Sequence, residues 1–564
     1  MYFRISSETW LVIFGTLFSI LLRACTNLHS HSGEATPPMY GDYEAQRHWM
    51  EITTNLPINQ WYYNTTNNDL NYWGLDYPPL TAYHMFICGK VANYLNENYT
   101  KLHDSRGYES DSHKVFMRYT VMLSDVLLYI PALIIYYQTC IKDGEVLENG
   151  VMKKKPQIPK KFTITKPMSS SLCTVLGLLY PGVILVDHGH FQYNSISLGF
   201  TILAITYILK ECDILASIFF CFALNYKQME LYHAIPFFLY LLSTCVPKPG
   251  QRTFWGIFRL FKISITVILC FGLIWLPFLF NFEDLMQVLH RLFPVARGVF
   301  EDKVSNLWCA LNVVFKFKTR FNNFEMMRVC LFTTFLGLLP SSLDLFLRPN
   351  LKKFVLAQIN SSLAFFLFSF QVHEKTILLA AVPVLLYFPF APFVCYWFLC
   401  ISVFSMIPLF FKDNLVIALI SLTLFYCITF RVTIEHSYRS MLNNRDGLKE
   451  YYRSLLHSLL DIEYKKASQI GIIKASLQQI SKNSDAIKTL IFHCVMFFSL
   501  TGCLLLFLAS LFFNPPVRYP DLYPLLISFY SCIHFLGFFV YFNIKQLKIP
   551  QQFGDIRIDK VKDS

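Results

Sequence analysis

Charged residues are scarce in this sequence. They make up 15% of its 564 residues, against about 25% in soluble globular proteins. Hydrophobic residues reach 54%, which excludes an ordinary soluble domain. A transmembrane helix needs about 20 mostly apolar residues, so the chain can supply about a dozen or more. We therefore expect an all-α polytopic membrane protein.

Several sequence motifs of soluble enzymes are also missing. The 16 cysteines include no CxxC pair and lie mostly within apolar runs, which argues against a disulfide framework and against a zinc site. There is no phosphate-binding loop, GxGxxG motif or internal repeat. The net charge of +12 comes from short basic clusters between apolar runs. Such clusters indicate membrane topology, so we expect no nucleic-acid partner.

Fourteen apolar runs predict about 14 transmembrane helices. Several runs are shorter than 18 residues, so we expect some helices to be tilted, broken or re-entrant. The first run is short enough that a cleaved signal peptide remains an alternative. The runs lie at 10–25, 117–138, 171–187, 195–209, 212–225, 231–246, 263–280, 329–347, 354–371, 376–389, 393–411, 415–430, 489–513 and 523–543.

The basic clusters orient the chain. Five of them fall on the same side when the runs are counted, and the positive-inside rule makes that side cytoplasmic, together with both termini. The other side receives loops 26–116 and 281–328, including the glycosylation sequons that begin at Asn64 and Asn98. We therefore expect these loops in the lumen of the endoplasmic reticulum or outside the cell. The five clusters lie at 139–170, 248–262, 348–353, 431–488 and from 545 onward.

Three parts of the chain follow from this topology. Residues 1–430 form a membrane module that carries the two luminal loops, and residues 489–564 form a helix pair with a cytoplasmic tail. Between them, residues 431–488 combine a basic charge with leucines at helical spacing. This pattern predicts an amphipathic segment on the cytoplasmic membrane face, with a solvated linker helix as the alternative.

Titratable residues outside the basic clusters gather on the luminal side. Asp42, Glu44 and Asp76 lie in loop 26–116 among aromatic residues and prolines. Aromatic rings stack on sugar faces and carboxylates bind hydroxyls, so this loop can form a sugar site. The alternative is purely structural, with Asp42 as the N-cap of a helix over 43–54 and Pro78-Pro79 as a rigid turn.

A second polar cluster follows the third run, where His188 and His190 stand one residue apart after Asp187. Two histidines suggest a metal site, but no third ligand stands at a recognisable spacing. A packed, hydrogen-bonded interface at the membrane edge is the favoured interpretation.

Cations close to the bilayer form the third cluster. Arg297 lies in loop 281–328, and His373 and Lys375 lie in a short turn between two runs. These side chains suit a lipid-linked phosphate, whose charge needs fixed donors. The alternative is interfacial anchoring with local ion pairs, Asp302 with Lys303 and Glu374 with Lys375.

Six motifs lie on the predicted luminal side. They are GDYEAQRHWMEIT from 41, NYWGLDYPPLTAYH from 71, DHGHFQYNS from 187, ARGVFEDKVSNLWC from 296, FQVHEKTILL from 370 and NPPVRYPDL from 514. Together they resemble the dolichyl-phosphate-glucose-dependent glucosyltransferases of asparagine-linked glycosylation. Within that family, the match favours the enzyme that adds the first glucose, because the paralogue that adds the second reads FEVHRNW and DHIHFQYN where this chain has YEAQRHW and DHGHFQYN. The longer basic segment 431–488 departs from the family pattern.

The resemblance implies a GT-C membrane glycosyltransferase of the endoplasmic reticulum with a luminal active site. Its donor is dolichyl phosphate β-glucose and its acceptor is the nine-mannose dolichol-diphosphate oligosaccharide. It joins them by an inverting displacement that forms an α-1,3 bond. Alternatives are the second-glucose paralogue and, in another class, a lipid flippase or transporter.

The resemblance also assigns roles to residues. Asp42 is the catalytic base, while Glu44, Asp76 and Tyr77 shape the acceptor side. His373, with Lys375 and Arg297 as weaker candidates, faces the donor phosphate. A single phosphate leaving group with such neighbours needs no metal, so we predict neither a metal nor another cofactor.

Overall fold

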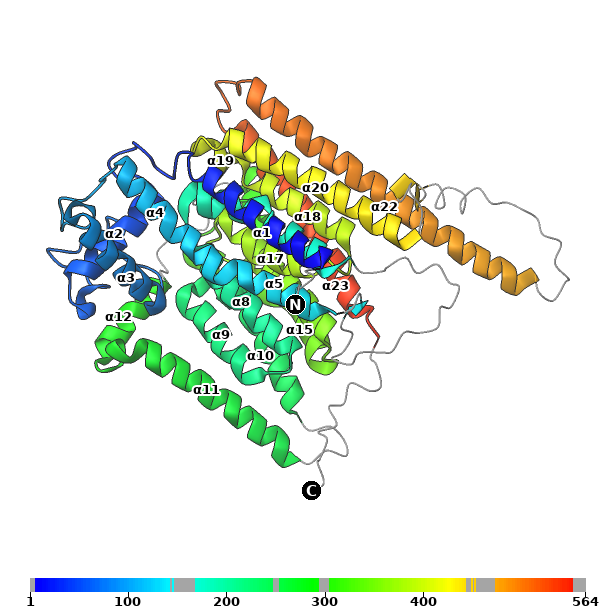
Figure 1. The fold of residues 1–564 in the computed structure, drawn as a ribbon, viewed down its shortest axis with the longest axis horizontal. Coiled ribbons are helices and arrows are strands. Elements are labelled where there is room, and N and C mark those ends of the chain that lie inside the picture. Colours follow the sequence, from blue (N-terminus) through cyan, green and yellow to red (C-terminus); the bar gives the residue numbers. More distant parts are fainter. Residues whose placement is uncertain are drawn as a thin grey trace, which may run out of the picture.

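The computed structural model describes residues 6–142, 145–146, 168–246, 253–293, 304–442, 448–449, 451–452 and 472–550. The described chain is almost entirely helical, with one antiparallel pair of short strands, β1 (Ile141–Lys142) and β2 (Glu145–Val146). Long helices form a bundle, and a smaller group of helices lies beyond one end of it (Figure 1). We call residues 27–110 of this group the end domain.

Nine described helices are long and apolar enough to cross a membrane. Two of them consist of several consecutive elements. The first contains α4 (Asp111–Ser124), the π-helical η3 (Asp125–Tyr129) and α5 (Ile130–Cys140). The second contains α6 (Ser170–Leu178), α7 (Pro181–Ile184) and the π-helical η4 (Leu185–Phe191). The seven simple ones are α1 (Ser7–Thr26), α11 (Thr253–Leu279), α15 (Asn323–Leu347), α16 (Leu351–Phe368), α20 (Val416–Leu442), α22 (Ile472–Phe512) and α23 (Leu522–Leu547).

Shorter apolar helices complete the bundle. They are α8 (Asn194–Leu209), α9 (Asp213–Tyr226), α10 (Leu231–Cys245), α17 (Leu378–Leu386), α18 (Pro392–Ser405) and α19 (Ile407–Lys412). Each of the fourteen predicted runs coincides with part of at least one helix, so the all-α polytopic class is confirmed. The count of about 14 crossings stays a prediction, because several runs form helices too short to cross a bilayer alone.

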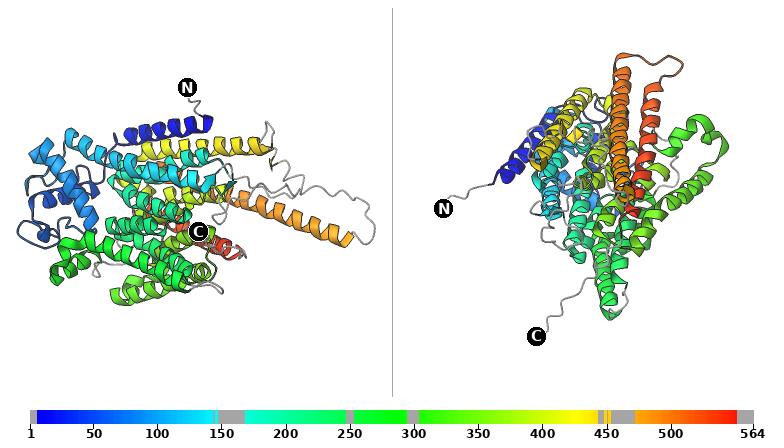
Figure 2. Two further views of the ribbon diagram at one scale, coloured as in Figure 1. Left: turned by 60° about the horizontal axis from the view of Figure 1, so that its bottom comes forward. Right: turned by 90° about the vertical axis from the view of Figure 1, so that its right-hand side faces the viewer.

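The end domain and the loops beside it contain short helices. The end domain is built on α2 (Asp42–Asn55), η1 (Ile58–Gln60), α3 (Pro79–Leu95) and η2 (Glu97–Tyr99). Elsewhere lie η5 (Gln228–Glu230), α12 (Phe282–Leu292), α13 (Leu307–Phe315), α14 (Phe317–Arg320) and η6 (Glu374–Ile377). Figure 2 shows α12 beside the end domain in a second view.

Two hydrophobic cores meet where the end domain joins the bundle. The larger core fills the bundle. The smaller one joins α2 residues such as Trp49 and Met50 to Phe191, Tyr193 and Tyr226, which come from the bundle side. Polar side chains at this junction are therefore fixed from both directions.

Buried charges lock η4 in place. The Arg23 Nε donates to Asp125 Oδ2 at 2.5 Å, and His188 Nε2 lies 3.1 Å from the same oxygen. All three side chains have 0% exposure. Segment η4 is π-helical, a local form that is frequent at functional sites. The network ties α1 and η3 to η4 and so sets the position of the residues that follow His188.

Two predicted features differ from the structure or lie outside it. Helix α20 continues to Leu442 without a break at the predicted boundary of 430, and a Glu435–Arg439 pair of 2.8 Å one turn apart supports its polar end. Residues 472–488 of this segment form the first part of α22, while 443–447, 450 and 453–471 lie outside the described residues. Arg297 and the rest of 294–303 lie outside them too.

Candidate active site

Asp42 lies at the centre of the candidate active site. Helix α2 begins at Asp42 with the extended Gly41 as its N-cap, so the structural alternative, in which Asp42 is the N-cap, is wrong by one residue. Its Oδ2 accepts from His190 Nε2 at 2.9 Å and from the side chains of Gln192 and Lys375. These partners stand about 150 and 330 residues away in the chain. Tertiary structure alone brings them together.

His190 lies between two carboxylates. Its Nδ1 is 2.6 Å from Asp413 Oδ2, and its Nε2 faces Asp42. The Lys375 ammonium is 3.0 Å from the same Nε2. An imidazole donates from both nitrogens only when protonated, so the two carboxylates favour the charged ring, whereas the ammonium of Lys375 opposes it. Asp413 follows α19 directly, so it holds His190 from the far side.

The cluster is open on one side only. The side chains of Asp42 and Lys375 are 22% and 18% exposed, whereas those of His190 and Asp413 are 4% and 2% exposed. Burial acts to raise the pKa of Asp42, but the charges of Lys375 and His190 outweigh it and hold that pKa well below its usual value. Asp42 is therefore an ionised carboxylate that remains accessible to a ligand.

Gln192 connects this cluster to a second lysine. The Nζ of Lys227, which directly follows α9, lies 3.3 Å from Gln192 Oε1 and also donates to Asn194 Oδ1. Lysine only donates, so it fixes the amide of Gln192 with its NH₂ toward Asp42. Burial lowers the pKa of Lys227 to about 8, and the charge of Lys375 acts in the same direction.

Aromatic rings lie next to the second lysine. The Nζ of Lys227 is 5.4 Å from the centre of the Tyr77 ring, and that ring is 5.0 Å from Trp49. Tyr77 and Trp49 come from the two motifs of the end domain that predict a sugar site. A sugar that packs on Tyr77 therefore lies within reach of the polar chain that leads through Gln192 to Asp42.

Asp76 and His373 border the site. The main-chain oxygen of Asp76 accepts from Gln228 Nε2 at 2.9 Å, which fixes the loop before α3. That helix begins at Pro79, so the predicted rigid turn is a helix start with proline in its favoured first position. His373 is half-buried and directly precedes η6, two residues before Lys375.

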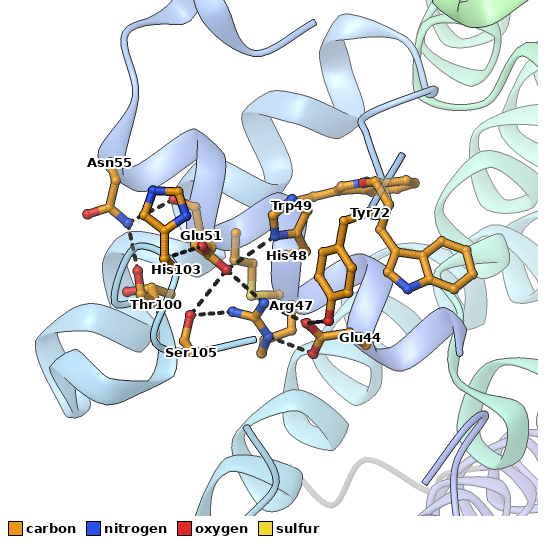
Figure 3. A network of polar contacts seen from close by, with 12 residues as sticks. Glu44, Arg47, His48, Trp49, Glu51, Asn55, Tyr72, Thr100, His103 and Ser105 are labelled. Atoms are coloured by element: carbon orange, nitrogen blue, oxygen red, sulfur yellow. Dashed lines mark hydrogen bonds and ion pairs between the residues drawn. The ribbon is translucent and has the colours of Figure 1, made fainter. Parts of the chain in front are cut away.

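Glu44 belongs to a different network, which Figure 3 shows. Both of its carboxylate oxygens accept from the Arg47 guanidinium at 2.7 Å, and Tyr72 donates to it at 2.8 Å. Arg47 also pairs with Glu51 at 2.7 Å and donates to Ser105 at 2.5 Å. The side chains of Glu44, Arg47 and Glu51 are 0% to 3% exposed. We call Glu44, Arg47 and Glu51 the end-domain triad.

Sequence reasoning missed several residues of the cluster. His190 was placed in a hydrogen-bonded interface, which the structure confirms, but its link to Asp42 was not foreseen. Lys227 and Asp413 both carried a detectable signal, because each is a charged residue between two predicted apolar runs. The structure groups no three histidine, cysteine or carboxylate side chains as metal ligands anywhere in its described residues.

Comparison with known proteins decides the family. A model described as the ALG6, ALG8 glycosyltransferase family matches residues 15–541. This chain belongs to that family. The family predicted from the luminal motifs is therefore confirmed, and the transporter alternative is excluded.

Curated relatives match along almost their whole length. A Gallus gallus protein named dolichyl pyrophosphate Man9GlcNAc2 alpha-1,3-glucosyltransferase is 44% identical over 541 residues, covering 95% of this chain and 97% of its own. The rat protein of that name is 42% identical, with 95% and 96% covered. The probable Drosophila melanogaster form is 42% identical, with 95% and 98% covered.

One solved structure is also similar in outline. ArnT from Cupriavidus metallidurans, in a crystal structure bound to undecaprenyl phosphate, aligns with 96% of this chain and 77% of its own, at 13% identity and a TM-score of 0.37.

Proposed function

We propose that this protein transfers glucose from dolichyl phosphate β-glucose to the terminal mannose 3-hydroxyl of the nine-mannose dolichol-diphosphate oligosaccharide, forming an α-1,3 bond. Relatives more than 40% identical over nearly the full length carry a name that describes glucosyl transfer to Man9GlcNAc2. The observation that carries the proposal is the ionised, partly exposed carboxylate of Asp42, which pairs with Lys375 and is linked through Gln192 to Lys227.

Asp42 is the base in this mechanism. All three side-chain contacts described above are to Oδ2, so Oδ1 is the oxygen that accepts the proton of the acceptor hydroxyl. A carboxylate of low pKa suffices, because an electron-poor anomeric carbon draws the hydroxyl proton off late. The hydroxyl oxygen bonds to the anomeric carbon as the bond to the phosphate oxygen breaks, and its proton passes to Oδ1 late in the same step. One such displacement inverts the configuration.

Cations stabilise the departing dolichyl phosphate. Lys375 reaches the Asp42 carboxylate from η6, and its ammonium is the nearest fixed cation to that carboxylate in the described site. His373, two residues earlier, and Arg297 complete the proposed donor side. Fixed donors act most strongly on the charge that grows on the phosphate in the transition state.

The acceptor packs on the opposite side of Asp42. Tyr77, backed by Trp49 and by Lys227, offers a ring face to the terminal mannose. Asp76 binds a hydroxyl of the same arm. Glu44 contributes indirectly, since it fixes the first turn of α2 through Arg47 and orients the Tyr72 hydroxyl.

The proposed location is the membrane of the endoplasmic reticulum, with the end domain luminal and both termini cytoplasmic. The fold proposed for this arrangement is GT-C. The basic clusters and the positions of Asn64 and Asn98, both exposed in the end domain, support this orientation.

A transfer assay tests the proposal. Purified full-length protein receives labelled dolichyl phosphate glucose and, in parallel, the nine-mannose acceptor and its singly glucosylated form. We expect transfer to the nine-mannose acceptor only. Transfer only to the glucosylated acceptor would identify the second-glucose activity, and transfer to neither would contradict the proposal.

A further inference from the structure

A cavity lies between the start of α18, the C-terminal ends of α20 and α23, and the middle of α22. Its volume is about 660 Å³, within the range of small-molecule sites, which is about 300–1,000 Å³. Its wall is mixed, with aromatic side chains that include Phe390, Phe393, Phe492 and Tyr541 beside aliphatic and polar residues. Figure 1 places these helix ends away from the end domain.

The cavity lies on the membrane face opposite the candidate active site. Asp413, which bonds to His190, stands just before α20, whereas the cavity residue Ser437 lies 21 residues after the first residue of α20, Val416. At 1.5 Å per residue the two points are about 30 Å apart along the helix, which equals the hydrocarbon thickness of a bilayer. The cavity therefore belongs to the opposite headgroup layer.

Lysines surround the cavity. Lys488 and Lys545 line it, one near the start of the apolar stretch of α22 and the other in the last turn of α23. A third lysine, Lys352, holds its Nζ 4.7 Å from the centre of the Phe390 ring. The apolar part of the wall suits the acyl chains of an anionic lipid, and the lysines suit its phosphate.

Two residues of the cavity wall each carry a buried polar atom without a hydrogen-bond partner in the described part of the chain. His493 is 8% exposed and lines the cavity, and its Nδ1 has no hydrogen-bond partner among the described residues. The buried Oγ of Ser437, another lining residue, also has no hydrogen-bond partner among the residues that the structure describes. Buried polar atoms normally find a partner, because leaving one unsatisfied costs about 1–3 kcal/mol. Because both residues line the cavity, a rotation of each side chain brings its polar atom to a headgroup oxygen.

We propose that this cavity binds the headgroup of an anionic phospholipid, with Lys488 and Lys545 on the phosphate and with His493 and Ser437 on neighbouring oxygens. The acyl chains leave between the aromatic walls. This site is separate from the proposed glucosyl transfer and does not rest on it. Its ligand is a lipid of the opposite leaflet, not the donor or the acceptor.

Native mass spectrometry of the full-length protein in detergent tests the proposal. The protein is titrated with phosphatidylinositol and with phosphatidylcholine of the same acyl chains. We expect tighter binding of phosphatidylinositol. Each lysine changed to alanine, Lys488→Ala or Lys545→Ala, should weaken that binding about 5-fold, with no change for phosphatidylcholine.

Matched variants distinguish lipid binding at this site from a general effect of positive charge. Lys548→Ala removes an exposed cation one turn beyond Lys545 on the same chain and should leave phosphatidylinositol binding unchanged. His493→Leu keeps the bulk of the side chain but removes both ring nitrogens, and should weaken the binding about 2- to 10-fold. Melting in lipid-free detergent verifies that each variant is folded.

Four outcomes would overturn the proposal. They are equal affinity for the two lipids in the wild-type protein, an equal loss in Lys548→Ala and Lys545→Ala, displacement of the lipid by millimolar inorganic phosphate, and stronger lipid binding after deletion of 453–471. The third outcome would assign the cavity to a soluble anion. The fourth would assign it to that segment of the chain.

Discussion

The end-domain triad and the Asp42 cluster are both built from carboxylates and cations, yet they differ in exposure and in origin. Glu44, Arg47 and Glu51 lie within eight residues on one face of α2 and are at most 3% exposed. The Asp42 cluster collects residues from distant parts of the chain and leaves Asp42 22% exposed. The closed end-domain triad stabilises a helix, whereas the open Asp42 cluster leaves a charged carboxylate accessible to a ligand.

The largest effect should come from breaking the end-domain triad. Arg47→Met leaves two buried carboxylates without their cation, which costs about 3–5 kcal/mol of folding free energy. Thermal unfolding in detergent measures this loss. The control is Lys101→Met, because the Lys101–Asp104 pair lies in the same domain but is 60% and 65% exposed. Equal stability of the two variants would remove the distinction between the networks.

The counterpart in the open cluster is Asp42→Asn. An amide keeps the shape of the side chain but cannot accept a proton, so turnover should fall by about 10²-fold or more. Single-turnover transfer at equal protein level measures this. The exposed Asp104→Asn in the same domain should retain turnover. Turnover of Asp42→Asn near that of the wild type would exclude Asp42 as the base.

His373→Ala should lower kcat by about 10-fold to 10³-fold, as for the loss of one preorganised donor. The change in acceptor KM should be smaller, because the donor phosphate is affected. If His373 serves packing alone, melting temperature falls while kcat per folded molecule is kept. The exposed His103→Ala provides the matched control, with neither quantity changed.

A smaller effect concerns pH. Lys227 is charged below a pKa of about 8, so its contact with Gln192 weakens as the pH rises through that value. We expect activity to decline above pH 8 in the wild type. Lys227→Arg, which stays charged, should shift this decline upward, while the carboxylate of Asp42, with its low pKa, causes no loss between pH 5 and 7. An identical alkaline limb in both proteins would argue against a role for Lys227.

The triad should respond to pH in the opposite range. Burial acts to raise the pKa of Glu51, but the His48 hydrogen bond and the Arg47 charge lower it from 4.5 to about 2. A carboxyl group whose folded pKa is depressed stabilises the protein fully above its unfolded pKa and loses this as the pH falls. Stability should therefore drop between pH 4.5 and 2, and less so in Glu51→Gln.

The last prediction is that removing divalent metal ions has no effect on activity. EDTA should leave glucosyl transfer unchanged, because in the proposed mechanism lysine and histidine side chains, rather than a metal, stabilise the leaving phosphate. Transfer rates before and after chelation measure this. Loss of activity restored by Mn²⁺ or Mg²⁺ would contradict the prediction and direct attention to Asp187 and His190.

Composition and motif order alone determined the class of this protein. An apolar run long enough to cross a bilayer must satisfy its backbone internally, so it becomes a helix wherever it lies. The motifs around Asp42, His190 and Lys375 were recognisable because each is a short polar stretch between apolar runs. Polar residues near a bilayer are costly, so such a stretch indicates a functional site.

Only the tertiary structure decided which of these polar residues meet. Glu44 and Asp42 are two residues apart, yet one joins a closed triad on α2 and the other reaches across to His190 and Lys375. Periodicity places residues on a helix face but says nothing of what packs against that face. The links from Asp413 to His190 and from Lys227 to Gln192 depend on how separate helices dock. No local pattern in the sequence encodes that docking.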